Sequence, residues 1–250
     1  MGIFGTIVGG TVGFMMGGPV GAILGSVMGS TLSRGAEVAQ RRVRSAQQQQ
    51  VAFAMVLTSL AAKVAKADGR VTGDEVRAFD DFLKQSLHMS VEDRKFAGEV
   101  FNRARDSETP ASEFAAQLRS VFPRQPDRLR DVLTILLMVA LADGQLHAAE
   151  EQLLRSIAGD LGLSGSDYES CKATFMSQTG ASGVDPYAVL GVPSTASDAE
   201  VRSAHRRLVR EYHPDVLESK GLPEDFMEFA AKKMSAINEA WSAVRKSRGL

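Results

Sequence analysis

An imidazole, a proline and a carboxylate follow one another near the C-terminus, at His213, Pro214 and Asp215. An imidazole near a carboxylate could transfer protons in acid–base catalysis. No nucleophile–base pair, glycine-rich phosphate loop or familiar metal-ligand spacing accompanies them in the sequence, so we expect that the chain is not an enzyme. Because proline disfavours helical geometry in the residue before it, a helix should end near His213 and leave the tripeptide as an exposed turn.

Four acidic residues occur in two similar stretches of the sequence. One reads VAKADGRVTGDEV and the other VALADGQLHAAEEQ, and in both a glutamate follows an aspartate by seven residues. The pairs are Asp68 with Glu75 and Asp143 with Glu150. The recurrence predicts two related helical halves. We expect these carboxylates to stabilise turns and the chain to carry no cofactor; the alternative is that they converge on a divalent cation, which prefers oxygen ligands.

The turns of the two stretches differ in one respect. Gly69 and Gly144 both suit the left-handed conformation that ends a helix. In the first stretch, Thr72 and Glu75 form the pattern of a capping box, which starts the next helix. In the second stretch His147 takes the place of the threonine and is a poor N-cap. We therefore expect the second copy to lack the capping box.

Composition and periodicity define the class of protein. The net charge of −1 provides no basic field that would attract nucleic acid, so no nucleic-acid partner is expected. The single cysteine excludes an internal disulfide and a cysteine-based zinc site. Apolar residues recur at spacings of three and four without strand-like alternation, which predicts an all-α fold. The clearest sets are Phe53, Val56, Leu57, Leu60 and Val64; Val76, Phe79, Leu83 and Leu87; and Leu129, Val132, Leu133, Leu136 and Val139.

The elements that would position the tripeptide follow from the last 66 residues. Tyr187–Leu190 should form a short helix that ends at Gly191. A second helix should begin after a cap at Ser197 or Asp198 and end near His213. A third helix should begin at Pro223 and pack against the second as an antiparallel hairpin. Four basic residues lie on the second helix, away from its apolar face: Arg202, Arg206 and Arg210 at a spacing of four, and Arg207 beside them.

The N-terminal segment has a different character, because no charged residue precedes Arg34. Residues four apart share one face of a helix, and a face of glycines lets a second helix approach closely in a membrane. The apolar stretch Ile3–Leu32 exceeds the length needed to span a bilayer and is too long for a signal peptide. Pro19 should kink one span, or else turn a hairpin; we favour one span. The glycines of the stripe are Gly5, Gly9, Gly13, Gly17, Gly21, Gly25 and Gly29.

These observations divide the chain into an anchor at residues 1–33, a basic connector at 34–50, a helical domain at 51–178, a linker at 179–184 and a C-terminal unit at 185–250. The arginines after the anchor predict that the domains stay in the cytoplasm and that the short N-terminus faces the other side. Self-association through the glycine face predicts a homodimer, and the other expected contact of the anchor is lipid.

The C-terminal unit resembles a J domain, the module of DnaJ-type co-chaperones. The resemblance rests on PYAVLGV at residues 186–192 and on His213-Pro214-Asp215 after a basic helix. It implies that the tripeptide and the four arginines engage a DnaK-type chaperone and promote its ATP hydrolysis, with Asp215 as the acidic contact and Pro214 fixing the turn. His205, where an aromatic tyrosine is common, and Val216, where a basic residue is common, depart from the family pattern.

The helical domain at 51–178 resembles TerB-like domains through its two Ala-Asp-Gly motifs and their downstream glutamates, and family members have been considered to bind metal there. The order of anchor, helical domain and J domain resembles the DjlA family of membrane-anchored DnaJ-like proteins over the whole chain. The resemblance implies a co-chaperone of the bacterial inner membrane that recruits DnaK locally. The alternative is a stress- or metal-responsive scaffold in which the TerB-like domain is the sensor.

Overall fold

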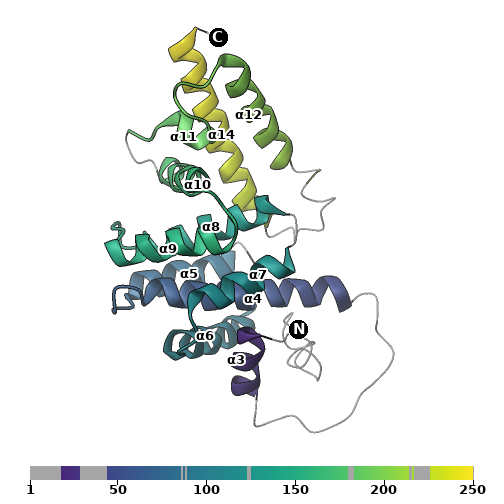
Figure 1. Ribbon diagram of the computed structural model, residues 1–250. Coiled ribbons are helices and arrows are strands. Elements are labelled where there is room, and N and C mark those ends of the chain that lie inside the picture. Colours follow the sequence, from purple (N-terminus) through teal and green to yellow (C-terminus); the bar gives the residue numbers. More distant parts are fainter. Residues whose placement is uncertain are drawn as a thin grey trace.

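A computed structural model describes residues 18–28, 44–85, 87, 89–122, 125–179, 183–213, 216 and 226–249. These residues form helices joined by short turns and contain no strand, which confirms the predicted all-α fold (Figure 1). The helices are α3 (Pro19–Met28), α4 (Arg44–Ala65), α5 (Gly73–Gln85), α6 (Val91–Asp106), α7 (Ala111–Val121), α8 (Pro126–Ala140), α9 (Ala148–Asp160), α10 (Gly165–Gln178), α11 (Pro186–Leu190), α12 (Asp198–Glu211) and α14 (Phe226–Arg248).

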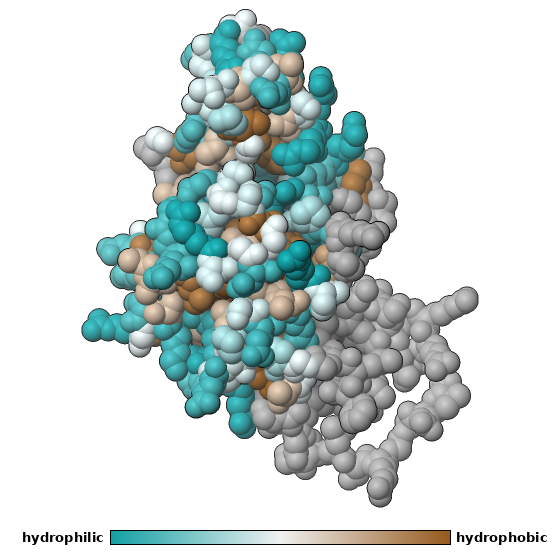
Figure 2. Space-filling model, viewed as in Figure 1, coloured by the Kyte–Doolittle hydropathy of each residue, from teal (hydrophilic) through white to brown (hydrophobic). Residues whose placement is uncertain are grey.

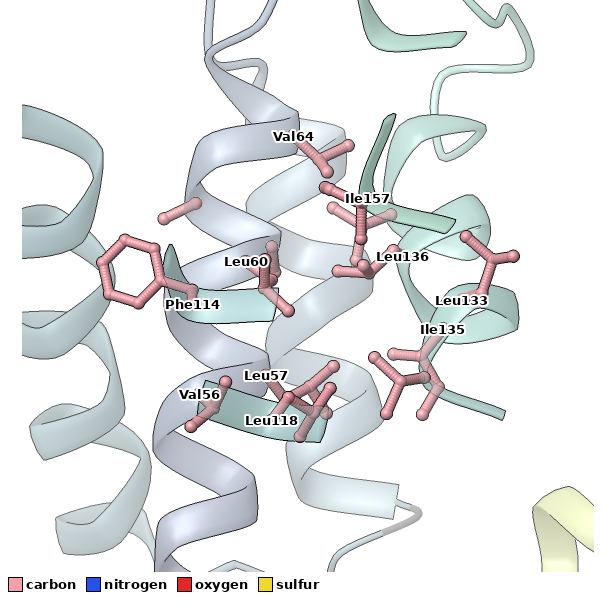
Figure 3. Close-up of a cluster of buried hydrophobic side chains, with 14 of the residues drawn as sticks. Val56, Leu57, Leu60, Val64, Phe114, Leu118, Leu133, Ile135, Leu136 and Ile157 are labelled. Carbon is pink, nitrogen blue, oxygen red and sulfur yellow. The ribbon is translucent and has the colours of Figure 1, made fainter. Parts of the chain in front are cut away.

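Helix α4 lies at the centre of the middle domain, residues 51–178. It contacts α6, α7, α8 and α9, and its apolar side chains are fully buried between them (Figure 3). Burial of one leucine or valine side chain stabilises a fold by about 1.5–3 kcal/mol, so this contact surface provides much of the stability of the domain. The residues that meet there include Val56, Leu57, Leu60 and Val64 of α4, Phe114 and Leu118 of α7, Leu133 and Leu136 of α8, and Ile157 of α9.

The predicted apolar sets are buried with two exceptions: Phe53 in α4 is only partly buried, and Val76 in α5 is exposed. In α5, Phe79 and Leu83 are buried, as is Leu87 after the helix, but Val76 is 45% exposed. Helix α5 begins at Gly73, so Val76 belongs to its first turn. The spacing pattern therefore identified the helix correctly but wrongly placed its first apolar residue in the core.

Helix α3 lies within the predicted anchor and packs against the middle domain. The chain has a positive φ of 90° at Gly18, and α3 begins at the following proline. Val20 and Ile23 are buried beside α6 and α7, and the Val20 N–H donates to Oε1 of Gln117 at 3.1 Å. Ten helical residues rise about 15 Å, half the apolar thickness of a bilayer.

Most of the predicted anchor lies outside the described residues. Of the glycine stripe, only Gly21 and Gly25 fall within α3; Gly5, Gly9, Gly13, Gly17 and Gly29 are not among the described residues. Within the part of the chain that the structure describes, none of the helices combines the length and apolar character that a membrane crossing needs. The single kinked span and the packing role of the glycines therefore stay predictions.

The C-terminal domain, residues 185–250, is built from α11, α12 and α14 around its own apolar core. Gly191 ends α11 with a φ of 69°, as predicted. Ser197 starts α12 with a complete capping box, in which its side chain accepts the Glu200 N–H and the Glu200 carboxylate accepts the Ser197 N–H. Helices α12 and α14 form the predicted hairpin, with Val201, Leu208, Ile237 and Val244 among the buried residues between them.

Candidate interface for a partner protein

The tripeptide begins where α12 ends. Tyr212 is the C-cap of α12, and His213 after it is exposed. The Val216 N–H donates to the His213 carbonyl at 3.0 Å, a bond across four residues that is typical of a tight turn. Pro214 and Asp215 are not among the described residues. The described ends of the segment agree with a turn that starts at the tip of the basic helix.

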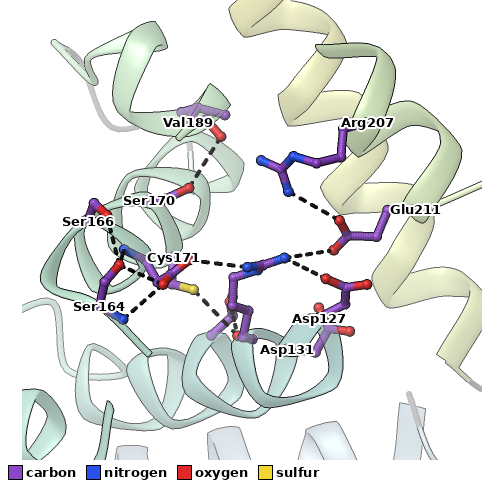
Figure 4. A network of polar contacts seen from close by, with 12 residues as sticks. Asp127, Asp131, Ser164, Ser166, Ser170, Cys171, Val189, Arg207 and Glu211 are labelled. Carbon is purple, nitrogen blue, oxygen red and sulfur yellow. Dashed lines mark hydrogen bonds and ion pairs between the residues drawn. The ribbon is translucent and has the colours of Figure 1, made fainter. Parts of the chain in front are cut away.

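The four arginines of α12 separate into two groups. Arg202, Arg206 and Arg210 are exposed and, at a spacing of four, follow one another along one side of the helix. Arg207 lies about 100° further round the helix, and its guanidinium pairs with the Glu211 carboxylate at 3.5 Å (Figure 4). The structure thus places three of the predicted arginines on one exposed side of α12, whereas the fourth pairs with Glu211 of the same helix.

The surface around α12 is polar. Figure 2 shows hydrophilic residues over most of the visible face of both domains, with apolar residues in small separate patches. His205, which replaces the aromatic residue common in J domains, stacks on Trp241 of α14 with ring centroids 4.7 Å apart. Its Nε2 also lies 3.3 Å from Oδ1 of Asn238. These contacts hold α12 against α14 at the level of the arginine row.

A second set of polar residues, which sequence reasoning missed, fixes the end of α12. The Tyr212 hydroxyl donates to Oδ1 of Asp131 in α8 at 3.0 Å, and Lys233 of α14 donates to the same oxygen at 2.8 Å. Asp131 directly precedes the apolar run of α8 and is buried, and a buried charged residue is costly without partners. That position was the only signal in the sequence, and it did not reveal the partners.

The four acidic residues of the repeat form two kinds of contact. Asp68 and Asp143 are exposed, and each accepts the N–H two residues later, at 2.8 Å from Arg70 and 2.9 Å from Gln145. Gly69 and Gly144, with φ of 86° and 88°, complete these turns. The two aspartates therefore have the turn-stabilising bonds that the sequence favoured.

Glu75 and Glu150 are both 2% exposed and interact with each other at the centre of the middle domain. Glu75 completes the predicted capping box with Thr72. The Glu150 carboxylate accepts the His147 N–H at 2.9 Å. The second stretch therefore keeps the bond that the glutamate makes in a capping box, and the expectation that it lacks a capping box was wrong for this bond. Burial, together with the neighbouring Glu75, raises the pKa of Glu150 to about 7.

The contacts of these residues bear on the cation alternative. Only two of the four predicted ligands meet, because Asp68 and Asp143 remain in their surface turns. In the described ranges, no group of three or more histidine, cysteine, aspartate or glutamate side chains is placed to hold a metal ion. A protonated Glu150 supplies the donor that the buried Oε1 of Glu75 lacks among the described residues. A proton on Glu150 would therefore give the pair a hydrogen-bond donor without a cation.

Comparison with known proteins places each part of the chain. The family described as tellurite resistance protein TerB matches residues 54–173, the DnaJ domain matches residues 185–248, and the co-chaperone DjlA transmembrane domain matches residues 1–42. The middle domain is thus a TerB domain, the C-terminal domain is a J domain, and the N-terminal segment corresponds to the membrane anchor of that family. No solved structure matches the chain.

Similarity to curated proteins extends over most of the chain. It is 30% identical over 230 residues to the co-chaperone protein DjlA of Aliivibrio fischeri, which covers 81% of each protein. It is 32% identical over 196 residues to DjlA of Shewanella oneidensis, with 75% of this chain and 74% of the relative covered, and 32% identical over 203 residues to DjlA of Coxiella burnetii, with the same coverage. With the three domains in the expected order, the chain belongs to the DjlA family of co-chaperone proteins.

Proposed function

We propose that the protein recruits a DnaK-type chaperone to the cytoplasmic face of the membrane and stimulates its ATP hydrolysis through His213, Pro214 and Asp215. The observation that carries the proposal is the exposed His213 at the tip of a capped basic helix, with a turn bond from Val216. The chain itself performs no chemistry in this proposal, because the tripeptide acts as a contact that biases the partner toward its hydrolysing state.

The arginine row supplies orientation. Arg202, Arg206 and Arg210 present their charges on one exposed side of α12, which suits an acidic groove on the partner. Exposed charges of this kind mainly raise the association rate and fix the register, and salt screens them. Arg207 is already paired with Glu211, so its contribution to the partner contact should be smaller than that of the other three.

The anchor would determine where this activity is used. The basic residues from Arg34 to Arg44 support a cytoplasmic location of both domains and a single crossing by the N-terminal segment. The glycine stripe supports close pairing of two anchors, which would bring two J domains close together on the membrane. Replacing Gly13 and Gly21 by isoleucine should weaken the signal in a membrane dimerisation assay, and an unchanged signal would remove the homodimer from the proposal.

Single-turnover ATP hydrolysis by DnaK tests the central claim. The full chain in lipid nanodiscs should accelerate hydrolysis, and His213→Gln should abolish the acceleration. His147→Gln provides a matched control, because it makes the same change at an exposed histidine of the middle domain. No acceleration by the wild-type chain, or equal acceleration by His213→Gln, would refute the proposal. Arg206→Glu should raise the concentration for half-maximal stimulation more than Arg207→Glu does.

The scaffold alternative depends on Glu75 and Glu150, the two predicted ligands that meet. Two carboxylates are fewer than the six to eight oxygen ligands typical of calcium, and they already share a contact with each other. Calorimetric titration of the full chain with Mg²⁺, Ca²⁺ and Mn²⁺ tests this function directly. Stoichiometric binding that Glu150→Gln removes would favour a metal-responsive scaffold. Absence of a heat of binding would exclude the scaffold and leave the co-chaperone function as the remaining candidate.

A further inference from the structure

The end of α12 that carries the tripeptide is buried in the contact between the two domains. Glu211 and Tyr212, the two residues before His213, are 8% and 3% exposed. Their partners across the boundary lie on α8 of the middle domain. One of them, Asp131, is 81 residues away from Tyr212 in the sequence. The J domain is therefore not suspended from its linker alone, because α10, α11 and α14 also pack against one another at this boundary.

Asp131 is the centre of the first part of this contact. Its Oδ1 accepts a hydrogen bond from the Tyr212 hydroxyl at 3.0 Å and one from the Lys233 ammonium at 2.8 Å. Asp131 and Lys233 are each 5% exposed. The ammonium also lies 4.7 Å from the centre of the Tyr212 ring. One carboxylate of the middle domain thus joins the end of α12 to the first half of α14.

The electrostatics of this buried group depend on all its members. Burial alone would lower the pKa of Lys233, but Asp131, together with Cys171 and Glu211, more than offsets it, so the pKa is raised. Burial and the Asp131 carboxylate raise the pKa of the Tyr212 hydroxyl, which therefore stays a proton donor. A buried ion pair loses most when one partner is removed, because the other charge is left uncompensated. The contact should therefore be sensitive to single substitutions.

Arg130 forms the second part of the contact. Its guanidinium lies 3.5 Å from Glu211 of α12 and 3.2 Å from Asp167 at the start of α10, and it also pairs with Asp127. In Figure 4, Glu211 lies between Arg207 of the same helix and Asp127 of α8, across the domain boundary. Burial and Asp127 raise the pKa of Glu211, while Arg130 opposes that shift.

The contact leaves the described partner-binding residues free of cover. His213, Arg202, Arg206 and Arg210 are exposed, although Glu211 and Tyr212 between them are buried. A contact that inhibited the J domain would cover the basic side of α12. The contact with the middle domain instead involves the buried residues Glu211 and Tyr212 at the end of α12 and leaves its basic side exposed. It resembles a support for the tripeptide rather than a lid over it.

We propose that Asp131 and Arg130 of the TerB domain are positioning residues for the stimulation of the DnaK-type partner: they hold the end of α12 so that His213 and the turn after it are presented in one orientation. The inference rests on the proposed function. A surface that is already ordered loses less conformational entropy when a partner binds, so the support lowers the protein concentration needed for stimulation.

The test uses the full chain in lipid nanodiscs and three variants. Asp131→Asn keeps the shape and removes the charge, Lys233→Met removes the partner charge, and the double variant removes both. We expect each single variant to raise the concentration for half-maximal stimulation by about tenfold, within the usual range for coupling between sites. The double variant should recover to within about threefold of wild type, because a neutral pair leaves no uncompensated charge.

Hydrogen exchange supplies a readout that stability alone would not change. In the single variants, peptides spanning Leu208–His213 should exchange faster, while the core peptides of α4 keep their protection. Tyr212→Phe removes only the hydroxyl and serves if a charge variant fails to fold; it should show the same two effects more weakly. Asp81→Asn, an identical change at an exposed position of α5, is the matched control and should behave as wild type.

The outcomes separate this inference from the proposed function. Wild-type chain that fails to stimulate DnaK refutes the proposed function, whatever the exchange experiment shows. Wild-type stimulation that is unchanged in Asp131→Asn and Tyr212→Phe refutes only the positioning role. Stimulation that rises when the contact is broken would mean that the contact restrains the J domain, and this too overturns the inference. Unchanged exchange at Leu208–His213 would show that Asp131 does not hold the end of α12.

Discussion

Replacing Glu150 by glutamine should stabilise the middle domain above neutral pH and remove most of the dependence of its stability on pH. Glu150 is 2% exposed and lies beside Glu75, which is equally buried. Two ionised carboxylates in this position repel each other and lack water to solvate them. A glutamine keeps the acceptor for the His147 N–H and provides an amide donor for Glu75 without a charge.

The pKa of Glu150 sets the size and the sign of the effect. It is about 7 in the folded protein against an ordinary value of 4.5, so the folded state binds the proton more tightly than the unfolded chain. The stabilisation is complete below about pH 4.5 and is lost as the pH rises through about 7. Each tenfold change in proton affinity is about 1.4 kcal/mol, which gives about 3 kcal/mol at most and about 1–3 kcal/mol after local relaxation.

Hydrogen exchange of α4 and α8 peptides measures this loss in the full chain. After correction for the intrinsic pH dependence of exchange, protection in wild type should fall between pH 5.5 and pH 8 by about fivefold to 30-fold, which corresponds to about 1–2 kcal/mol. Glu150→Gln should keep nearly constant protection and exceed wild type at pH 8. Carboxylates with lowered pKa, such as Asp167, lose their stabilisation only at more acidic pH and do not interfere.

Glu99→Gln is the matched control, because Glu99 is exposed in the neighbouring helix α6. It should follow the wild-type profile. The pKa of Glu211 is also raised, but Glu211 is present in both glutamine variants, so the difference between their profiles reports on Glu150 alone. A wild-type protection that rises toward pH 8, or a Glu150→Gln profile with the wild-type slope, would show that the two carboxyl groups do not share a proton.

Four further substitutions test the fold that positions the site. Arg248→Ala should lower the melting temperature of the J domain in calorimetry, because Arg248 bonds the Tyr187 hydroxyl, the Ala196 carbonyl and Asp198. Ser197→Ala should destabilise the J domain by about 1 kcal/mol in urea titrations followed by Trp241 fluorescence, since it removes an N-cap. Gly144→Ala should cost the middle domain about 1–2 kcal/mol, although its Cβ would meet no atom within 4 Å, because φ is 88°. Leu136→Ala should lower the free energy of unfolding of the middle domain by about 2–5 kcal/mol, because Leu136 is fully buried. Hydrogen exchange of middle-domain peptides measures the effects of Gly144→Ala and Leu136→Ala.

Local signals were sufficient to predict most of the secondary structure and the turns. Gly191 and Ser197 mark the end of α11 and the start of α12 because a left-handed residue and a side-chain cap are properties of a few adjacent residues. The buried row on α4 follows from helical spacing. Val76 shows the limit of this reasoning, since spacing gives the face of a helix but not how far the neighbouring helices extend over it.

Contacts between residues far apart in the chain could not be predicted from local sequence patterns. The Ala-Asp-Gly repeat made Glu75 and Glu150 equivalent, but equivalence does not say that the two side chains meet. Asp131 and Lys233 are 102 residues apart, and an aspartate at the start of an apolar run does not predict which residue is its partner. Arg207 was grouped with the arginine row although Glu211, four residues later, can pair with it on the same helix; the position of Glu211 at the domain boundary was not visible in the sequence.

If the protein acts at the membrane as proposed, the arrangement of its domains gives the middle domain a role as a spacer. In Figure 1, α3, which lies within the predicted anchor, and the J domain are at opposite ends of the middle domain, so α3 is remote from α12. A basic helix on a loose tether would be attracted to anionic headgroups, which would compete with an acidic partner for Arg202, Arg206 and Arg210. That attraction decays within about 8 Å at physiological salt. Under the proposed function, a middle domain between anchor and J domain would remove the competition by distance. The contacts of Asp131 and Arg130 with Tyr212 and Glu211 would then keep the end of α12 on the middle domain.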